Sequence, residues 1–296
     1  MIWTLTFNPA LDYAVYVPGY TEGKTNRSAC EQLDFGGKGI NVSYVLHQLG
    51  EPTVALGFVA GFTGRALCDL LRATGVMCDF VELERGMTHI NVKIKCENET
   101  EINAAGPDIS AAALEALYDK LDRIAPGDIL LLAGSVPSSL PKDIYETILS
   151  RLQGRGIHFA VDAEGQLLLN VLAYRPLLIK PNRAELCGLV GRELITDAEV
   201  ECAARELQAR GARNVLVSLG GDGAMLLDEQ GGVHRAFAVG GKPINTVGAG
   251  DSMVAGFLSG LGQGYEYALR LGIAAGSATA CSPQLATRAE IERLMQ

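Results

Sequence analysis

The sequence predicts an α/β fold in which a central, mostly parallel sheet is flanked by helices on both faces. Short aliphatic runs, such as the wholly apolar run at residues 129–133, alternate along the chain with segments of helical periodicity. Strands without polar alternation are typical of parallel sheets that are buried on both faces. The 35 glycines among 296 residues lie between these runs without a fixed period, which predicts many tight turns.

Each expected element has a local justification. The continuous apolar runs that we expect to form strands are residues 2–8, 53–59, 128–133, 158–162, 177–180 and 214–218. The expected helices are residues 40–49, 64–74, 111–124, 142–153, 196–210 and the chain end from residue 287. Gly50 and Gly75 mark two helix ends, and Ser110 is a suitable N-cap. Residues 196–199 and 287–290 match the capping-box pattern.

Two segments, residues 13–35 and 88–104, interrupt this alternation because they carry strand patterns with no helix between them. In residues 90–95 apolar and polar side chains alternate, which is typical of a strand with one exposed face. We therefore expect a small β-sheet that forms a lid on the α/β body. The sequence contains no visible linker or repeat, so residues 1–296 are predicted to form one domain with this lid.

The composition excludes several classes of protein. Hydrophobic residues make up 48% of the chain and charged residues 20%, which excludes a disordered protein. The net charge of −9 and the lack of a basic run argue against a nucleic-acid partner. The seven cysteines include no C-x-x-C pair, which argues against a zinc site or a disulfide framework. Neither a signal peptide nor a membrane-spanning run is visible, so we expect a cytoplasmic protein without a membrane partner.

Residues 245–257 carry the strongest chemical signal. Gly248, Ala249 and Gly250 are expected to form a turn at the start of a helix, with Asp251 in its first turn. Unpaired backbone N–H groups and the helix dipole attract phosphate at such a position. Helix capping would explain Asp251 alone. It explains the two glycines less well, because glycines let the backbone approach an anion closely.

A second glycine-rich segment, residues 36–39, surrounds Lys38 at the junction of a loop and a helix. Such a loop could hold an anionic group. It is not a P-loop, because the upstream glycine and the Ser or Thr after the lysine are missing. A glycine-rich turn with a solvated Lys38 is an equally good interpretation of this segment alone.

Two further polar segments follow expected strands. Asn182 and Glu185 are three residues apart and would share a helix face, and an amide with a carboxylate suits Mg²⁺ and its waters. The same pair is also the common pattern of helix N-capping. Residues 218–223 form a glycine-rich turn between two strands, which by itself predicts only a hairpin.

Taken in order, these segments resemble the phosphofructokinase-B branch of the ribokinase-like sugar kinases. Residues 6–12 resemble the first strand of that family with its substrate-binding Asp, residues 36–41 its first signature, and residues 245–257 its highly specific second signature. The resemblance covers essentially the whole chain and implies a three-layer ribokinase-like fold with a β-sheet lid. Residues 90–93 and 100–103 are most similar to the bacterial 1-phosphofructokinases of this family.

The resemblance implies ATP-dependent phosphorylation of the C6 hydroxyl of fructose 1-phosphate, which gives fructose 1,6-bisphosphate, with ATP and Mg²⁺ bound. It makes Asp251 the general base and assigns the anion hole to Gly248, Ala249 and Gly250. The residues that it assigns to the sugar and its phosphate are Asp12, Arg27, Gly37, Lys38, Asn41 and Lys93. The residues that it assigns to ATP are Lys180, Asn182, Ser218, Gly220, Gly221 and Gly223, with Glu185 for the metal.

His89 departs from the family pattern, which usually has Arg before the Ile-Asn-Val-Lys stretch as a ligand of the substrate phosphate. His89 is only partly charged near pH 7, whereas Arg is always charged. This departure leaves open a tagatose-6-phosphate kinase or a kinase of another sugar phosphate.

Two other functions fit the sequence less well. A catalytically silent sugar-phosphate sensor would not need Asp251. A nicotinamide dehydrogenase would carry a glycine fingerprint after the first strand, and this sequence lacks it.

The exposed strand edges of the lid predict a homodimer, because an unpaired edge favours association.

Overall fold

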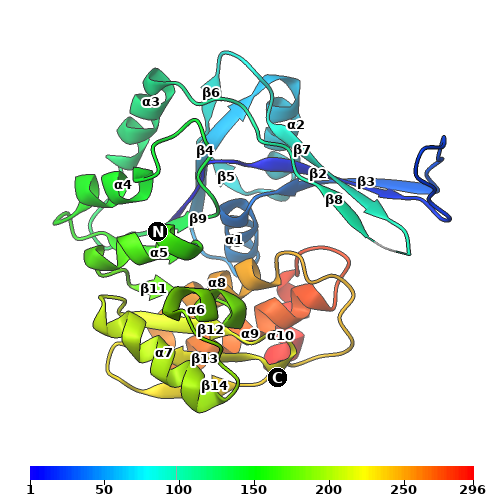
Figure 1. Ribbon diagram of the computed structural model, residues 1–296. Coiled ribbons are helices and arrows are strands. Elements are labelled where there is room, and N and C mark those ends of the chain that lie inside the picture. Colours follow the sequence, from blue (N-terminus) through cyan, green and yellow to red (C-terminus); the bar gives the residue numbers. More distant parts are fainter. Residues whose placement is uncertain (98) are drawn as a thin grey trace.

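The computed structural model describes residues 1–97 and 99–296, which form a large sheet, a small sheet and the helices that cover them (Figure 1). The strands of the large sheet are β1 Ile2–Thr6, β4 Thr53–Ala60, β5 Met77–Cys78, β6 Val81–Leu83, β9 Ile129–Ala133, β10 His158–Asp162, β11 Leu178–Ile179, β12 Asn214–Ser218, β13 Ala224–Leu227 and β14 Val233–Ala236. Their order is β14-β13-β12-β11-β10-β9-β1-β4-β5, with β6 also paired to β4. The pairings from β12 to β5 are parallel, and β13 and β14 extend one edge in antiparallel fashion. The predicted mostly parallel sheet is confirmed.

Helices cover both faces of this sheet. They are α1 Lys38–Gln48, α2 Gly61–Thr74, α3 Ala111–Leu121, α4 Ile144–Leu152, α5 Gly165–Val171, α6 Arg183–Val190, α7 Asp197–Ala209, α8 Ala249–Gly260, α9 Tyr265–Ala280 and α10 Arg288–Met295. In β9, Leu130 and Leu132 belong to the core shared with α3 to α7, whereas Leu131 belongs to the core shared with α1, α8, α9 and α10. Alternate residues of one buried strand therefore serve opposite helix layers, as a three-layer fold requires.

Local signals in the sequence account for several helix ends. The Ser110 hydroxyl accepts a hydrogen bond of 3.2 Å from the Ala113 N–H group at the start of α3. Reciprocal capping boxes open α7 at residues 196–199 and α10 at residues 287–290. Gly75 ends α2 in the left-handed conformation, with a φ of 84°. These four predictions are confirmed, because each depends only on residues within one helical turn.

None of the helices in the described part of the chain is both long enough and apolar enough to cross a membrane.

The small sheet consists of β2 Ala10–Tyr16, β3 Cys30–Gly36, β7 His89–Lys95 and β8 Thr100–Ile102, in the order β3-β2-β7-β8. Its strands lie in the two segments that interrupt the β–α alternation, although β2 begins three residues before the segment expected at 13–35. The β2–β3 hairpin extends away from the rest of the molecule (Figure 1). Leu11, Ile40 and Leu67 belong to an apolar cluster that joins this sheet to α1 and α2.

Helix α9 was not predicted, and its contact with α8 depends on glycine. A Cβ atom on Gly256 of α8 would lie 2.5 Å from the Leu271 carbonyl oxygen of α9. A Cβ atom on Gly260 would lie 2.7 Å from the Ala268 Cα atom. The two helices therefore approach backbone to backbone, and this contact supports the helix whose first turn carries Asp251.

We expect Gly256→Ala to lower the free energy of unfolding by about 1–3 kcal/mol, because the added methyl group overpacks the contact between α8 and α9. Urea titration followed by circular dichroism measures this loss. Gly188→Ala in α6 is the matched control, since nothing lies within 4 Å of its added Cβ atom. The control should match or exceed wild-type stability by up to about 1 kcal/mol, because alanine favours the helix. A Gly256→Ala protein as stable as the control would contradict the close packing.

Candidate active site

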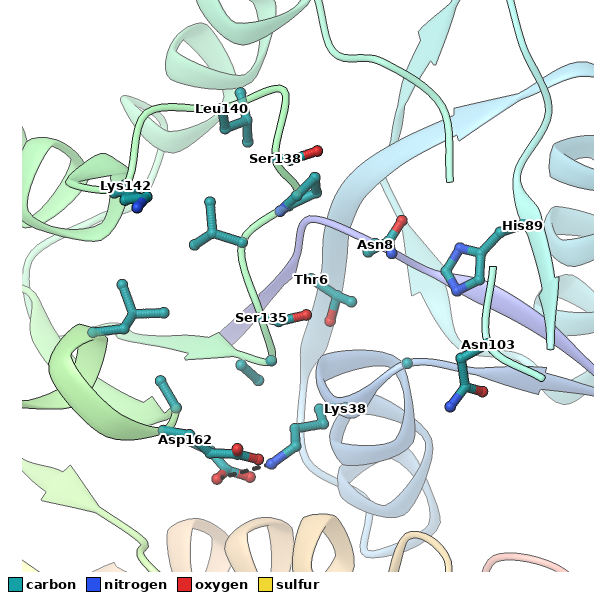
Figure 2. Close-up of a pocket in the computed structure, with 18 of the residues that line it drawn as sticks. Thr6, Asn8, Lys38, His89, Asn103, Ser135, Ser138, Leu140, Lys142 and Asp162 are labelled. Carbon is teal, nitrogen blue, oxygen red and sulfur yellow. Dashed lines mark hydrogen bonds and ion pairs between the residues drawn. The ribbon is translucent and has the colours of Figure 1, made fainter. Parts of the chain in front are cut away.

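A cavity of about 890 Å³, here called the larger cavity, lies where the carboxyl ends of β9 and β10 meet the small sheet (Figure 2). Open α/β sheets bind their ligands at this edge. Figure 2 shows His89 and Asn103 on one side of the cavity and Lys142 on the opposite side. Its polar lining comprises Thr6, Asn8, Lys38, His89, Asn91, Asn103, Ser135, Ser138, Lys142, Asp162, Glu164, Gln166 and Asn170.

A second cavity of about 420 Å³, the smaller cavity, lies between the small sheet, α1 and the chain that flanks α8. It is lined by Asp12, Asn41, Lys93 and Asn245, among others. Helix α1 contributes to both cavities, because its first residue, Lys38, lines the larger one and Asn41, one turn later, lines the smaller one. Of the predicted sugar residues, the larger cavity is lined by Gly37, Lys38 and His89, and the smaller one by Asp12, Asn41 and Lys93.

The start of α8 combines a tight turn with a nearby cation. Gly248 precedes the helix with a φ of 78°, which disfavours other residues. A Cβ atom on Gly250 would lie only 3.4 Å from the Lys180 Nζ atom, so this ammonium group faces the first turn of the helix. The first N–H groups of a helix have no acceptor within the helix. Together with Lys180, they create a positive potential that suits a phosphate group.

Asp251 lies in this first turn and is buried, with 7% of its surface exposed. Its Oδ2 atom accepts a hydrogen bond of 2.8 Å from the Asn41 side-chain amide, which links α8 to α1. Burial and the nearby Asp162 carboxylate raise the pKa of Asp251 to about 6, against the lowering effects of Asn41 and of two lysines. A carboxylate with such a pKa is a stronger proton acceptor than an exposed one and is still ionised at pH 7.

Asp162, at the carboxyl end of β10, was given no role from the sequence. Its Oδ1 atom lies 3.3 Å from the Nζ atoms of both Lys38 and Lys180, and the residue is 1% exposed. Figure 2 shows its contact with Lys38 at the base of the larger cavity. Its Oδ2 atom is buried without a hydrogen-bond partner in the described part of the chain. The signal for it in the sequence was its position as the last residue of the strand expected at residues 158–162.

The pKa of Lys38 depends on the same cluster. Burial lowers this pKa, but the carboxylates of Asp162, Asp251 and Glu185 outweigh burial and raise it above its ordinary value. Lys38 therefore carries a full positive charge at neutral pH. It is not a solvated lysine on a glycine-rich turn, because its ammonium group is directed at the buried Asp162.

Asn182 and Glu185 form a reciprocal capping box at the start of α6. The Asn182 backbone N–H group donates to Glu185 Oε2 at 2.9 Å, and its side-chain amide donates to Oε1 at 2.7 Å. Capping, the commoner interpretation of this pair, is therefore present. Each carboxylate oxygen accepts one of these bonds and retains a further lone pair for another donor or a hydrated cation.

The glycine-rich turn lies beside this capping box. An isolated parallel bridge joins Asn182 to Ser218 at the end of β12. Residues 220–222 form one turn of 3₁₀-helix, and Gly223 has a φ of 90°. A Cβ atom on Gly223 would lie 2.1 Å from the Ala236 carbonyl oxygen, so only glycine fits there. The turn connects β12 to the antiparallel β13, as its hairpin pattern predicts.

Three further predicted residues, described next, lie in different surroundings. His89 is buried, lines the larger cavity, and has an Nδ1 atom without a hydrogen-bond partner in the described residues. Burial lowers the pKa of His89, although the nearby Asp12 opposes this effect. Lys93 pairs with Asp12. Arg27 is exposed in the connection between β2 and β3 and is not among the residues that line the two cavities.

Comparison with known proteins agrees with this geometry. Residues 5–292 match the model of the pfkB family of carbohydrate kinases. The 1-phosphofructokinase of Bacillus subtilis is 42% identical over 100% of this chain and 97% of its own length. The D-tagatose-1-phosphate kinase of Bacillus licheniformis is 38% identical over 99% of this chain and 97% of its own length.

A solved structure also matches. The tetrameric inhibited form of phosphofructokinase-2 from Escherichia coli superposes with a TM-score of 0.91 at 31% sequence identity, and the match covers 99% of this chain and 97% of that one. The family match spans nearly the whole chain and includes the start of α8, Asp251 and the capping box of α6. The chain belongs to the pfkB family of carbohydrate kinases.

Proposed function

We propose that this protein transfers the γ-phosphoryl group of ATP to the C6 hydroxyl of fructose 1-phosphate, which yields fructose 1,6-bisphosphate and ADP. The observation that carries the proposal is Asp251, a buried carboxylate with a pKa of about 6 in the first turn of a helix that faces a lysine. This arrangement puts a proton acceptor beside an anion site. The identity of the sugar is supported by the 1-phosphofructokinase relative.

In this proposal Asp251 takes the proton of the C6 hydroxyl as its oxygen forms a bond to the γ-phosphorus. The bond between that phosphorus and the β–γ bridging oxygen breaks, and ADP leaves with the electron pair. The N–H groups of Gly248 and Gly250 and the Lys180 ammonium group stabilise the charge on the transferring group. The Ala249 N–H group already donates to the Thr246 carbonyl oxygen at 3.2 Å. Lys38, which Asp162 orients, adds a second fixed cation near the same point.

ATP would extend from this point toward the carboxyl ends of β11 and β12. Asn182, Ser218 and the glycines of the following turn adjoin one another there and would border the nucleotide. Gly220 and Gly221 leave room for its phosphates, because nothing lies within 4 Å of an added Cβ atom on either residue. Gly223 is needed instead for the close backbone contact of the turn.

Mg²⁺ would accompany ATP and neutralise part of its phosphate charge. The described residues contain no group of three or more His, Cys, Asp or Glu side chains arranged to hold a metal ion by themselves. Mg²⁺ commonly retains several waters and binds through one or two carboxylates together with substrate phosphates. Glu185 and the unpartnered Oδ2 atom of Asp162 fit this role, since both adjoin the lysine cluster.

The sugar would bind where the two cavities adjoin, with Asp12, Gly37 and Asn41 facing its hydroxyls. His89 and Lys38 line the larger cavity and are candidates for the substrate phosphate. The small sheet would act as the lid that covers the bound sugar and excludes water, which limits hydrolysis of ATP. These assignments follow from the family membership and from the positions of the side chains.

A kinase of another ketose phosphate is the second candidate, and His89 favours it. A histidine whose pKa is lowered by burial is neutral at pH 7 and offers a phosphate dianion a weaker contact than arginine would. The D-tagatose-1-phosphate kinase relative acts on such a substrate. Tagatose 6-phosphate is a further substrate to be tested.

We also propose that the protein works in the cytoplasm as a homodimer that forms through the lid. Strands β3 and β8 are the edges of the small sheet. Tyr16, Leu33 and Ile102 on this sheet expose 39%, 44% and 56% of their surface. Unpaired edges that carry apolar side chains favour association. The tetrameric form of the E. coli relative is consistent with association of chains of this fold.

The substrate is tested by ADP release in a coupled assay with Mg-ATP. We expect kcat/KM for fructose 1-phosphate to exceed that for tagatose 1-phosphate, tagatose 6-phosphate and fructose 6-phosphate by at least about tenfold, the discrimination that a contact of about 1.4 kcal/mol provides. A higher kcat/KM for a tagatose phosphate would assign the protein to the second candidate function. No turnover of any sugar phosphate would support a silent sensor.

Asp251 predicts an acid limb in the pH profile of kcat/KM. Its carboxylate must be ionised to accept a proton, and its pKa is raised to about 6. The value of kcat/KM should therefore be full above this pKa and fall about tenfold per pH unit below it.

Asp251→Asn should lower kcat by about 10²–10⁴-fold, the range expected for loss of a general base, with an unchanged circular dichroism spectrum. An Asp251→Asn enzyme with wild-type kcat would refute the assignment.

The dimer is tested by light scattering, which should give twice the mass of one chain. Leu33→Glu should shift the mass toward that of a monomer, because it puts a charge on the edge strand β3. Ile195→Glu is the control, since Ile195 is 70% exposed and lies outside the small sheet. A wild-type protein that remains monomeric at every concentration tested would contradict this proposal.

A further inference from the structure

The Asp12 carboxylate is held by two side chains from the neighbouring strand. Asn91 Nδ2 donates to Asp12 Oδ1 at 2.9 Å, and Lys93 Nζ lies 2.9 Å from Asp12 Oδ2. The parallel register of β2 and β7 puts Asp12 opposite Asn91, and Lys93 two residues further along. Asn91 and Lys93 therefore project from the same face of the sheet as Asp12.

These contacts fix the orientation of the Asp12 carboxylate. A carboxylate oxygen only accepts hydrogen bonds, so the Asn91 amide must direct its nitrogen toward Asp12. A third strand, β3, packs against the same carboxylate, since a Cβ atom on Gly36 would lie 2.6 Å from Asp12 Oδ1. The side chains of Lys93 and Asp12 are only 12% and 18% exposed, so water competes weakly for the ion pair.

Each oxygen of Asp12 accepts one of these bonds and keeps a lone pair for another donor. Two acceptors fixed side by side match two neighbouring hydroxyl groups of a sugar. The orientation of the Asn91 amide also leaves its Oδ1 atom buried without a partner in the described part of the chain. Asn91 lines the larger cavity, whereas Asp12 and Lys93 line the smaller one, so this row of side chains adjoins both.

The family resemblance assigned Lys93 to the phosphate of the substrate. We propose instead that Lys93 and Asn91 are positioning residues, which orient Asp12 so that it accepts hydrogen bonds from two adjacent sugar hydroxyls. The proposal rests on the proposed function, in which those groups are the 3- and 4-hydroxyls of fructose 1-phosphate. The charge of Lys93 is then matched by Asp12, and the substrate phosphate must be bound by other groups.

The test compares a complete substrate with an analogue that keeps its phosphate. Lys93→Met should lower kcat/KM for fructose 1-phosphate by about 10- to 100-fold, the usual effect of losing a charge-assisted hydrogen bond. The inhibition constant of 3,4-dideoxyfructose 1-phosphate should change by less than about threefold, a difference within the range of a weak, indirect contact. The analogue lacks the two hydroxyls, so it does not depend on the orientation of Asp12.

Two variants complete the test. Asp12→Asn should reproduce the pattern of Lys93→Met, because both variants disturb the same carboxylate contact. Lys120→Met is the control, since Lys120 pairs with Asp79 and lines neither cavity, and its kcat/KM should equal that of the wild type. Thermal unfolding of each variant checks that the small sheet is intact.

An equal loss for fructose 1-phosphate and for the dideoxy analogue after Lys93→Met would overturn the proposal, because it would show a direct contact with the phosphate. An unchanged kcat/KM for fructose 1-phosphate would overturn it as well. Failure of the proposed function is a separate result, seen when the wild-type protein does not use fructose 1-phosphate. The comparison is then made with the sugar phosphate that it does use and the matching dideoxy analogue.

Discussion

The buried carboxylate of Asp162 is the interaction on which the rest of the site depends. It holds the ammonium groups of Lys38 and Lys180 at the same oxygen, although the two lysines come from distant parts of the chain. Without the Asp162 carboxylate, the ammonium groups of Lys38 and Lys180 would lie close together and repel each other. With it, they form a compact cluster of fixed charge directly beside the start of α8. A phosphate-transfer site needs such cations in place before its substrate arrives.

The same carboxylate also affects the proton acceptor. Asp251 is desolvated by the close packing of α8, and the charge of Asp162 adds to the effect of burial, so its pKa rises to about 6. Asn41 and the lysines limit the rise, which keeps Asp251 ionised at neutral pH. The proton acceptor and the lysine cluster are therefore coupled through Asp162.

The short-range features of this protein could be predicted from its sequence. The helix ends at Ser110, Thr196 and Thr287 depend on contacts within one turn, and the buried strands depend on runs of aliphatic residues. The family and its signature around Asp251 were also recognisable, because residues 245–257 combine glycines and a carboxylate in one continuous segment. Helix α9 was missed, since its close contact with α8 depends on glycines whose role is visible only against a neighbouring helix.

The long-range contacts were decided only by the tertiary structure. Asp162 was not among the predicted site residues, and its role arises because the carboxyl ends of β10 and β11 lie side by side and bring Lys180 to it. The sequence does not show which group the Lys93 ammonium contacts. The register of β2 with β7 brings it to Asp12. The sequence alone determined the fold class, the helix ends and the family. The tertiary structure decided the partner of each charge, because such pairs join residues that are far apart in the chain.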